Sequence, residues 1–148
     1  MIRVQQLPFD AAAELAALAS RVPTAGAIAS FVGLVRPATS DTIVDRLELD
    51  HHGQFTQATV AAIGDDARRR FALLDLTVIH RFGSLAPGEP IVFVAAAAAH
   101  RRAAFDAVDY LMDRLKTEAP FWKREHGPGG ARWIEPTPDD HAAHGRWD

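Results

Sequence analysis

The sequence predicts a single α+β domain. Two periodicities occur along its 148 residues. Some apolar runs have strand length, and longer stretches repeat an apolar residue every three or four positions, as amphipathic helices do. Helices and strands mix without a regular strand–helix–strand rhythm, and no internal repeat is present. A chain of this length buries about 68–70% of its unfolded surface, so residues 1–148 are expected to form one domain, with a polar C-terminal tail from about residue 136.

The N-terminal region is expected to contribute two strands and a helix. Residues 1–7 alternate weakly between apolar and polar and suit an edge strand. Asp10 suits the N-cap of a short helix that runs to about Ser20. Residues 26–33, GAIASFVG, read as a buried strand because they are almost continuously apolar.

A turn-rich polar loop follows. It starts at Arg36 and is rich in turn-forming residues, namely Pro37, Thr39, Ser40 and Asp41. A flexible polar loop beside an arginine suits a lid over a ligand, and an ordinary hairpin connection would explain the same residues. The alternating run at residues 42–50 then predicts a strand with Leu47 and Leu49 on one face.

The middle of the chain predicts a helix and a strand. His51 and His52 come first, but adjacent residues on an extended chain point to opposite faces, so we favour a structural role over a shared metal ion. A helix is expected at residues 55–71, with Phe55 on its apolar side. Residues 73–80 predict the next strand.

The second half is organised around one buried strand and the helix after it. Residues 91–99, IVFVAAAAA, are continuously apolar. The strand ends at His100, and a helix continues until Pro120 stops it. A glycine-rich connection at 126–130 and a short final strand follow. The apolar face of the helix is expected to contain Ala104, Phe105, Val108, Leu111, Met112 and Leu115.

Basic residues gather where this helix begins, at His100, Arg101 and Arg102. The helix dipole disfavours cations there, by ~0.3–1 kcal/mol each. Such cations make sense around a bound anion, since arginine suits phosphate and free backbone N–H groups assist. Alternatively, the arginines extend into solvent and Arg102 pairs with Asp106 one turn later. The residues alone leave the two interpretations evenly matched.

A second basic group lies at and beyond the helix end. Lys116 borders the apolar face, and Lys123 follows the aromatic pair Phe121–Trp122. A lysine close to apolar surface and to another cation has a lowered pKa, which makes its amine useful in catalysis. The alternative is an ordinary surface lysine whose stem covers apolar groups.

Composition excludes several kinds of chemistry. The chain has no cysteine, which rules out disulfides, thiolate catalysis and cysteine-bound metals, so any sulfur chemistry must take its sulfur from elsewhere. The net charge of −3 disfavours nucleic-acid binding, which needs a broad basic face. No run approaches the roughly eighteen apolar residues of a membrane span, and the N-terminus is unlike a signal peptide, so we expect a cytoplasmic protein without membrane contact.

One long segment carries a family resemblance. LKTEAPFWKRE, residues 115–125, lies downstream of an Ala-His-Arg triplet whose histidine is sixteen residues before Lys116. This combination resembles the catalytic (large) subunit of molybdopterin synthase, the MoaE family, which carries a nearly identical K-T-x-A-P-F-W-K-x-E segment. So long a motif is far more specific than a short glycine pattern. The similarity also covers ASFVGLVR (29–36), the stretch 78–101 and RWIE (132–135).

The resemblance implies a fold and a reaction. The fold is an α/β-hammerhead with an additional small antiparallel β-subdomain, and the protein is a homodimer. The family adds two sulfurs to cyclic pyranopterin monophosphate (precursor Z) to form the dithiolene of molybdopterin, in molybdenum cofactor biosynthesis. The sulfur arrives as a thiocarboxylate on the C-terminal Gly-Gly of a small ubiquitin-like subunit, within a heterotetramer of two large and two small subunits. We expect no cofactor and no metal.

The resemblance also assigns roles to basic residues. It places Arg36, His100 and Arg101 at the substrate phosphate, with Arg36 reaching the site of the neighbouring subunit. Lys116 is the best candidate for acid–base chemistry or a covalent role. Lys123 is the candidate for positioning the thiocarboxylate or stabilising developing negative charge.

Other residues are weaker candidates. Phe31, Met112 and Phe121 could line a pterin pocket, although such side chains are more often plain core. Glu125 could orient Lys123 or act on a proton. The family resemblance makes His80 and its neighbour Arg81 structural or interfacial.

The sequence departs from the family after residue 50. HHGQF, residues 51–55, stands where the family usually has His-Tyr-Pro-Gly-Met, so no role is transferred to residues 52–55. The main alternative function is a non-catalytic, dimeric phosphate-ester-binding module. A phosphohydrolase is weaker, because neither a metal cluster nor a nucleophile motif accompanies the basic residues.

Overall fold

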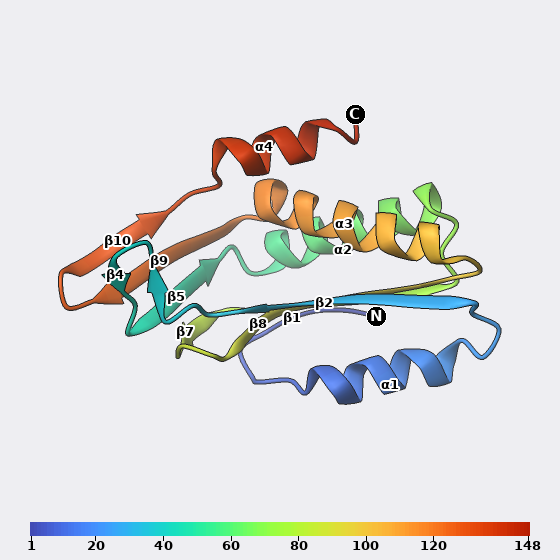
Figure 1. The fold of residues 1–148 in the computed structure, drawn as a ribbon, viewed down its shortest axis with the longest axis horizontal. Helices are drawn as coiled ribbons and strands as arrows, with labels where there is room; N and C mark the ends of the chain where they lie inside the picture. Colours follow the sequence, from blue (N-terminus) through green and yellow to red (C-terminus); the bar gives the residue numbers. More distant parts are fainter.

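The computed structural model describes all of residues 1–148 and shows a mixed sheet with helices on both faces and a second sheet at one end (Figure 1). In the main sheet β1 runs parallel to β6, and the other neighbours are antiparallel. The predicted α+β class is confirmed. In spatial order, the main sheet comprises β1 (Ile2–Gln5), β6 (Asp75–Arg81), β8 (Pro90–Ala98) and β2 (Ala27–Leu34).

The central strand β8 separates two cores because its side chains alternate between faces. Phe93, Ala95 and Ala97 face the helix α1 (Ala11–Arg21), together with Leu18. Val94 and Ala96 face the opposite side, where α2 (Gln54–Arg70) and α3 (Arg101–Glu118) pack. Burial on both faces explains why this stretch is continuously apolar.

The N-terminal elements largely follow the sequence. β1 is an edge strand, as predicted. Asp10 caps α1 by accepting hydrogen bonds from the backbone N–H groups of Ala12 and Ala13, at 2.9 and 3.1 Å. This is the predicted N-cap, and it satisfies donors that the first helical turn leaves free.

The prediction of a buried strand at residues 26–33 is wrong. β2 forms the other edge of the main sheet and pairs only with β8. Phe31, Val32 and Leu34 are exposed, Leu34 by 54%. No helix or loop of the chain fully covers these apolar side chains at the edge of the sheet.

The second sheet is the small antiparallel β-subdomain that the family resemblance implies. The loop after Arg36 forms a hairpin with Ser40 at φ 54°, so the hairpin interpretation describes this loop. Leu47 and Leu49 are buried on one face, as predicted. The sheet comprises β10 (Gly130–Ile134), β9 (Phe121–Gly127), β5 (Arg46–His51) and β7 (Gly83–Leu85), and the hairpin comprises β3 (Ala38–Thr39) and β4 (Thr42–Ile43).

Two phenylalanines lie outside the core, contrary to the sequence prediction. Phe55 in the first turn of α2 is 65% exposed, and Phe105 on α3 is 59% exposed. Phe55 precedes the turns of α2 that pack over the sheet, and the buried Thr56 takes the inward position. On α3 the inward positions belong to Ala104 and its neighbours one turn on, so Phe105 is rotated toward solvent.

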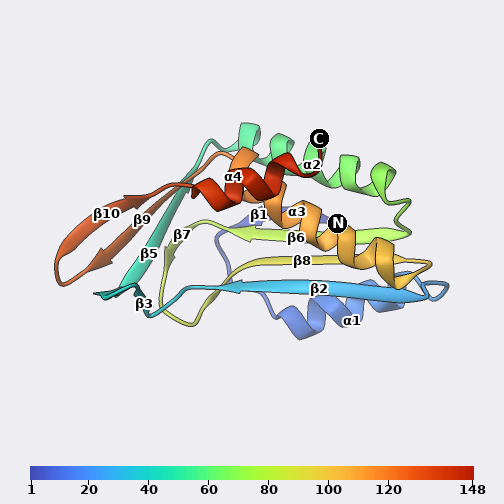
Figure 2. The ribbon, with the colours of Figure 1, turned by 45° about the horizontal axis from the view of Figure 1, so that its top comes forward.

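The C-terminal residues are also different from the prediction. Instead of a polar tail, they form α4 (Pro138–Gly145), which lies across α3 (Figure 2). Arg146, directly after the helix, pairs with Asp109 and Asp113 of α3. Trp147 packs against Phe71 and Tyr110. The polar C-terminal sequence therefore reflects ion pairs between this segment and α3.

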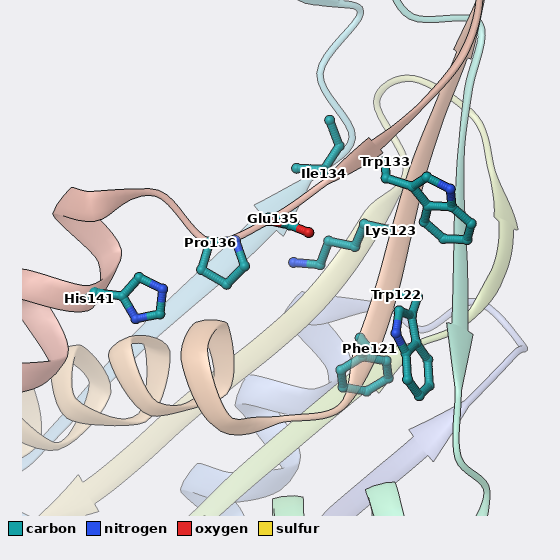
Figure 3. A pocket seen from close by; sticks show the side chains of 8 residues that line it. All are labelled: Phe121, Trp122, Lys123, Trp133, Ile134, Glu135, Pro136 and His141. Atoms are coloured by element: carbon teal, nitrogen blue, oxygen red, sulfur yellow. The ribbon is translucent and has the colours of Figure 1, made fainter.

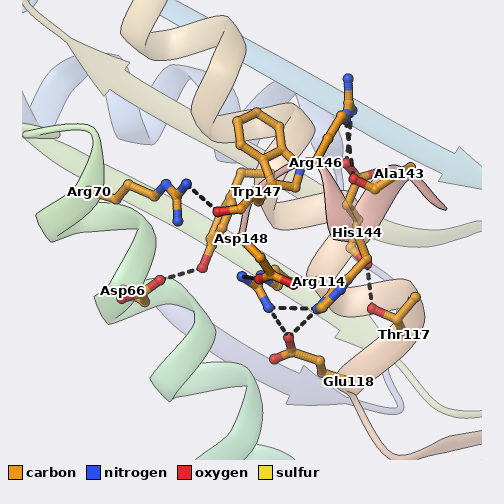
Figure 4. Close-up of polar contacts among 12 residues, drawn as sticks. Asp66, Arg70, Arg114, Thr117, Glu118, Ala143, His144, Arg146, Trp147 and Asp148 are labelled. Atoms are coloured by element: carbon orange, nitrogen blue, oxygen red, sulfur yellow. Dashed lines mark hydrogen bonds and ion pairs between the residues drawn. The ribbon is translucent and has the colours of Figure 1, made fainter. Parts of the chain in front are cut away.

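Figure 4 shows the polar contacts that this segment makes with α3. Arg114 and His144 both reach the Glu118 carboxylate, at 2.5 and 2.7 Å. Arg114 also donates to Asp148 at 3.0 Å. No helix in the chain combines the length and the apolar character that crossing a membrane requires.

Candidate active site

A pocket of about 320 Å³ opens where the β-subdomain meets α4 (Figure 3). The turn at Pro120 brings the chain from α3 into β9, and β10 returns beside β9 to start α4. Residues from the start of β9, from the end of β10 and from α4 thus share one pocket. The lining residues are Phe121, Trp122, Lys123, Trp133, Ile134, Glu135, Pro136 and His141.

Lys123 is the cation inside this pocket. It lies on β9 opposite Leu49 of β5 and Ile134 of β10. Figure 3 shows its amine directed toward Pro136 and Glu135, where β10 leads into α4. Burial lowers the pKa of Lys123, the nearby charge of Lys116 lowers it further, and no side chain accepts a hydrogen bond from its amine. A desolvated amine of this kind is suited to proton transfer or nucleophilic attack.

Lys116 lies beside the pocket, in the last turn of α3. Its Nζ is 3.1 Å from Oδ1 of Asp140, in the first turn of α4. The side chain remains 46% exposed, so its ammonium is open to a ligand. The structure therefore brings both predicted lysines to one place, on either side of the turn at Pro120.

Glu125 does not orient Lys123. Its carboxylate accepts a hydrogen bond from the Thr39 hydroxyl at 2.8 Å and pairs with Arg132 at 2.9 Å. These contacts tie the β3–β4 hairpin to β9 and β10. Glu125 thus holds the loop that follows Arg36 against the subdomain.

The three predicted apolar lining residues lie in different places. Phe121 lines the pocket and stacks on the His80 ring, with centroids 3.8 Å apart and an interplanar angle of 14°. Met112 packs against the main core from α3. Phe31 is on the exposed surface of β2.

The second predicted cation group lies at the opposite end of α3. Fifteen residues separate Arg101 from Lys116, which is about 22 Å along a helix at 1.5 Å per residue. His100 and Arg101 are exposed, and Arg102 pairs loosely with Asp106 at 3.8 Å. Within one chain, the structure does not bring these cations to the pocket.

Arg36 lies at the same end of the main sheet as Lys116 and Lys123. β2 and β8 are antiparallel, with Ala27 opposite Ala98 and Leu34 opposite Pro90. Arg36 follows the end of β2 and is therefore at the far end of the sheet from His100. Because α3 runs back over β8, its C-terminus lies at that same end.

Comparison with known proteins decides the family. Residues 4–118 match the family model described as MoaE protein. The chain belongs to the MoaE family. It is 48% identical over 148 residues to the molybdopterin synthase catalytic subunit of Caulobacter vibrioides, covering 100% of this chain and 97% of that protein. It is 46% identical over 140 residues to that of Escherichia coli, covering 95% and 93%.

Solved structures agree with this assignment. The molybdopterin biosynthesis MoaE protein from Burkholderia ambifaria superposes with a TM-score of 0.84 at 44% identity, covering 99% of this chain and 97% of that one. Molybdopterin synthase from Staphylococcus aureus gives 0.76 at 26% identity, with 88% and 94% covered. These relatives support an enzyme of molybdenum cofactor biosynthesis, and they do not support the non-catalytic alternative.

One residue beside the lysines, Asp140, was missed in the sequence of this MoaE family member. His80, which the family resemblance made structural or interfacial, is buried beneath Phe121, and burial, together with the Lys123 charge, lowers the pKa of His80 to about 3. Asp140 was hidden by the tail interpretation, although a threonine three residues before an acidic residue suggests a capped helix start.

Proposed function

We propose that this chain transfers sulfur to precursor Z and forms the molybdopterin dithiolene, in the cytoplasm. The observation that supports this most is that Lys116 lies beside the pocket that contains Lys123, in a chain without cysteine. Without a thiol of its own, the chain depends on a sulfur donor that reaches the pocket. The donor we propose is the thiocarboxylated C-terminus of a small ubiquitin-like subunit.

The two lysines suit an anionic donor tail. The exposed ammonium of Lys116 can bind a thiocarboxylate and stabilise negative charge that develops during transfer. The lowered pKa of Lys123 increases the fraction of free amine, which can accept a proton. A Gly-Gly end carries no side chains, so it can pass through a narrow channel beside Phe121 and the two lysines.

The substrate phosphate requires cations from a second copy of the chain. About 22 Å separates Arg101 from Lys116 along α3, which is too far for one small molecule to bridge. The exposed apolar edge formed by Phe31, Val32 and Leu34 is a suitable dimer surface. In this proposed homodimer, Arg36 serves its own lysines, and His100 and Arg101 reach across. The family resemblance instead implied that Arg36 is the residue that reaches the neighbouring subunit.

A mixing experiment tests the shared site. At a pyranopterin concentration well below KM, homodimers of Lys116→Ala chains and homodimers of His100→Ala/Arg101→Ala chains are each expected to be nearly inactive. Random pairing makes half of the dimers mixed, and each mixed dimer has one intact site of two, so about a quarter of wild-type activity should return. If the site lies within one chain, mixing restores nothing.

Reconstitution tests the reaction itself. The purified chain is mixed with a thiocarboxylated small partner and the pyranopterin, and dithiolene product is measured. One bulky residue added to the partner's C-terminus should remove activity, because the channel admits only glycine. Removal of its two glycines should greatly weaken the complex. Equally tight binding of the glycine-free partner would place the interface elsewhere.

A further inference from the structure

The Asp140 carboxylate links the start of α4 to the lysine pair. Its Oδ2 accepts hydrogen bonds from the backbone N–H and the hydroxyl of Thr137, both at 2.8 Å. The Asp140 backbone N–H donates to the Thr137 hydroxyl in return, at 3.2 Å. Its other oxygen, Oδ1, accepts from Lys116 Nζ at 3.1 Å.

This geometry fixes a side chain that would otherwise be mobile. A lysine has a flexible four-carbon stem, and no other side chain accepts a hydrogen bond from Lys116. The capping box holds the Asp140 carboxylate in one orientation, so the ammonium that binds it is held as well. An ammonium has three N–H donors, and Asp140 occupies one of them, which leaves two for a ligand.

We propose that Asp140 is a positioning residue for sulfur transfer: it holds the Lys116 ammonium at the mouth of the pocket that contains Lys123, so the active site is complete only when α4 is docked. This inference rests on the proposed function. The C-terminal helix is accordingly a structural part of the site, and its polar sequence serves that role.

The charges around Lys123 make this arrangement measurable. Lys116 and Asp140 act on Lys123 in opposite directions, and His80 adjoins it as a neutral ring. Glu135 and His141 also line the pocket. Burial opposes ionisation of Asp140, but its bonds from Thr137 and Lys116 outweigh burial and lower the pKa of Asp140 to about 2. Asp140 is therefore negative at every working pH, and loss of its charge should lower the pKa of Lys123 further.

Four variants separate the charge of Asp140 from its capping role. Asp140→Asn removes the charge, while its amide oxygen can still accept the Thr137 hydrogen bonds. Asp140→Glu keeps both the charge and a capping-box acid. Thr137→Val removes the capping hydroxyl, but the Thr137 backbone N–H still donates to the Asp140 carboxylate and the Asp140–Lys116 pair remains. Asp139→Asn is the matched control, since it removes the same charge from the same helical turn without touching Lys116.

The first measurement does not depend on catalysis. Amine-selective labelling of the free protein across pH, read by mass spectrometry, reports Lys116 and Lys123 separately. In Asp140→Asn, Lys123 should become reactive at lower pH and Lys116 should label faster, whereas Asp139→Asn should match wild type. Unchanged labelling of both lysines in Asp140→Asn overturns the proposal, whether or not the protein transfers sulfur.

The second measurement is sulfur transfer with the thiocarboxylated partner. Asp140→Asn should lower kcat about tenfold with little change in KM for the pyranopterin, because misplacement of a catalytic group affects the transition state. Asp140→Glu should recover part of this loss, and Thr137→Val should keep most of the activity. Full kcat in Asp140→Asn, or an equal loss in Thr137→Val, overturns the positioning role. If wild type itself transfers no sulfur, the proposed function fails, and the labelling still decides whether Asp140 holds Lys116.

Discussion

The two ends of α3 both carry cations, but the chain completes only one of them. At the C-terminal end, Lys116 is held by Asp140, and Lys123 is enclosed by β9, β10 and the start of α4. At the N-terminal end, His100 and Arg101 are exposed. The fold therefore preorganises the lysine end, whereas the cations at the arginine end face solvent.

The helix dipole also favours cations at the C-terminal end of α3 over cations at its N-terminal end. A cation in the last turn is stabilised by the dipole and one in the first turn is destabilised, by ~0.3–1 kcal/mol each. Lys116 therefore occupies a favourable position even without ligand. His100 and Arg101 occupy an unfavourable one, which a bound phosphate would relieve.

Loss of Lys116 should have the largest effect. Lys116→Ala should reduce sulfur transfer by at least about a hundredfold, as expected for removal of an acid–base or charge-stabilising group. Thermal stability and the particle size in solution should be unchanged, because the side chain is half exposed and alanine favours a helix. Arg69→Ala, on the exposed side of α2, is the control. Normal turnover by Lys116→Ala would remove Lys116 from the mechanism.

Replacement of His80, which adjoins the lysine pair, should change how the free energy of unfolding depends on pH. The pKa of His80 is lowered to about 3 from its ordinary 6.5 in the folded protein, first by burial and then by the Lys123 charge. The unfolded chain therefore binds a proton first as the pH falls. The associated stability is fully present above about 6.5 and is lost as the pH falls toward 3.

Urea unfolding at pH 7 and pH 5 measures this effect. At pH 5 the folded protein must keep His80 neutral although the unfolded chain would protonate it. The loss of stability corresponds to the difference between pH 5 and 6.5, about 1.5 pH units, or about 2 kcal/mol. Wild type should lose that much more stability between the two pH values than His80→Gln does. His52→Gln, at an exposed histidine, should behave like wild type. If wild type and His80→Gln lost the same stability between pH 7 and pH 5, protonation of His80 in the folded protein would cost no stability.

The fold was largely predictable because its signals are local. The nine-residue apolar run before His100, the Asp10 cap and the stop at Pro120 each act through neighbouring residues, and each is found as expected. The exceptions depend on distant contacts. β2 is as apolar as a buried strand, but no neighbour covers it in one chain. The polar C-terminus gains its structure from pairing with α3, which composition alone does not reveal.

For the candidate site, the sequence predicted that the two lysines lie close together, but it did not predict the partners of the other residues. The lysine motif identified the groups, and the turn at Pro120 places them together. Glu125 illustrates the limit, because its partners Thr39 and Arg132 are distant in sequence and occupy its carboxylate. The separation between Arg101 and Lys116 follows from helix length alone, so the sequence is sufficient to predict it.

Loss of Arg101 should have a moderate effect at the open end of α3. Its proposed partner is a phosphate remote from the reacting carbons, so it should contribute binding that is equal in the ground and transition states. Arg101→Ala should therefore raise KM for the pyranopterin about tenfold and leave kcat nearly unchanged. Steady-state kinetics with saturating partner measures both. A reduced kcat at constant KM would place Arg101 at the reacting centre.

Loss of Arg102 should have the smallest effect, although it is adjacent to Arg101 and carries the same charge. Its side chain is 83% exposed and its only partner is Asp106, at 3.8 Å. Exposed pairs at this spacing contribute about 0.3–0.5 kcal/mol, and removal of a cation from the first helical turn offsets that loss through the dipole. Arg102→Ala should therefore change the free energy of unfolding by less than about 0.5 kcal/mol and KM by less than about twofold. Urea unfolding and kinetics at low and high salt check both values, since salt screens exposed charges. If Arg102→Ala raised KM as much as Arg101→Ala, the open end of α3 would act as a general field of positive charge, and the assignment of the phosphate to His100 and Arg101 would be wrong.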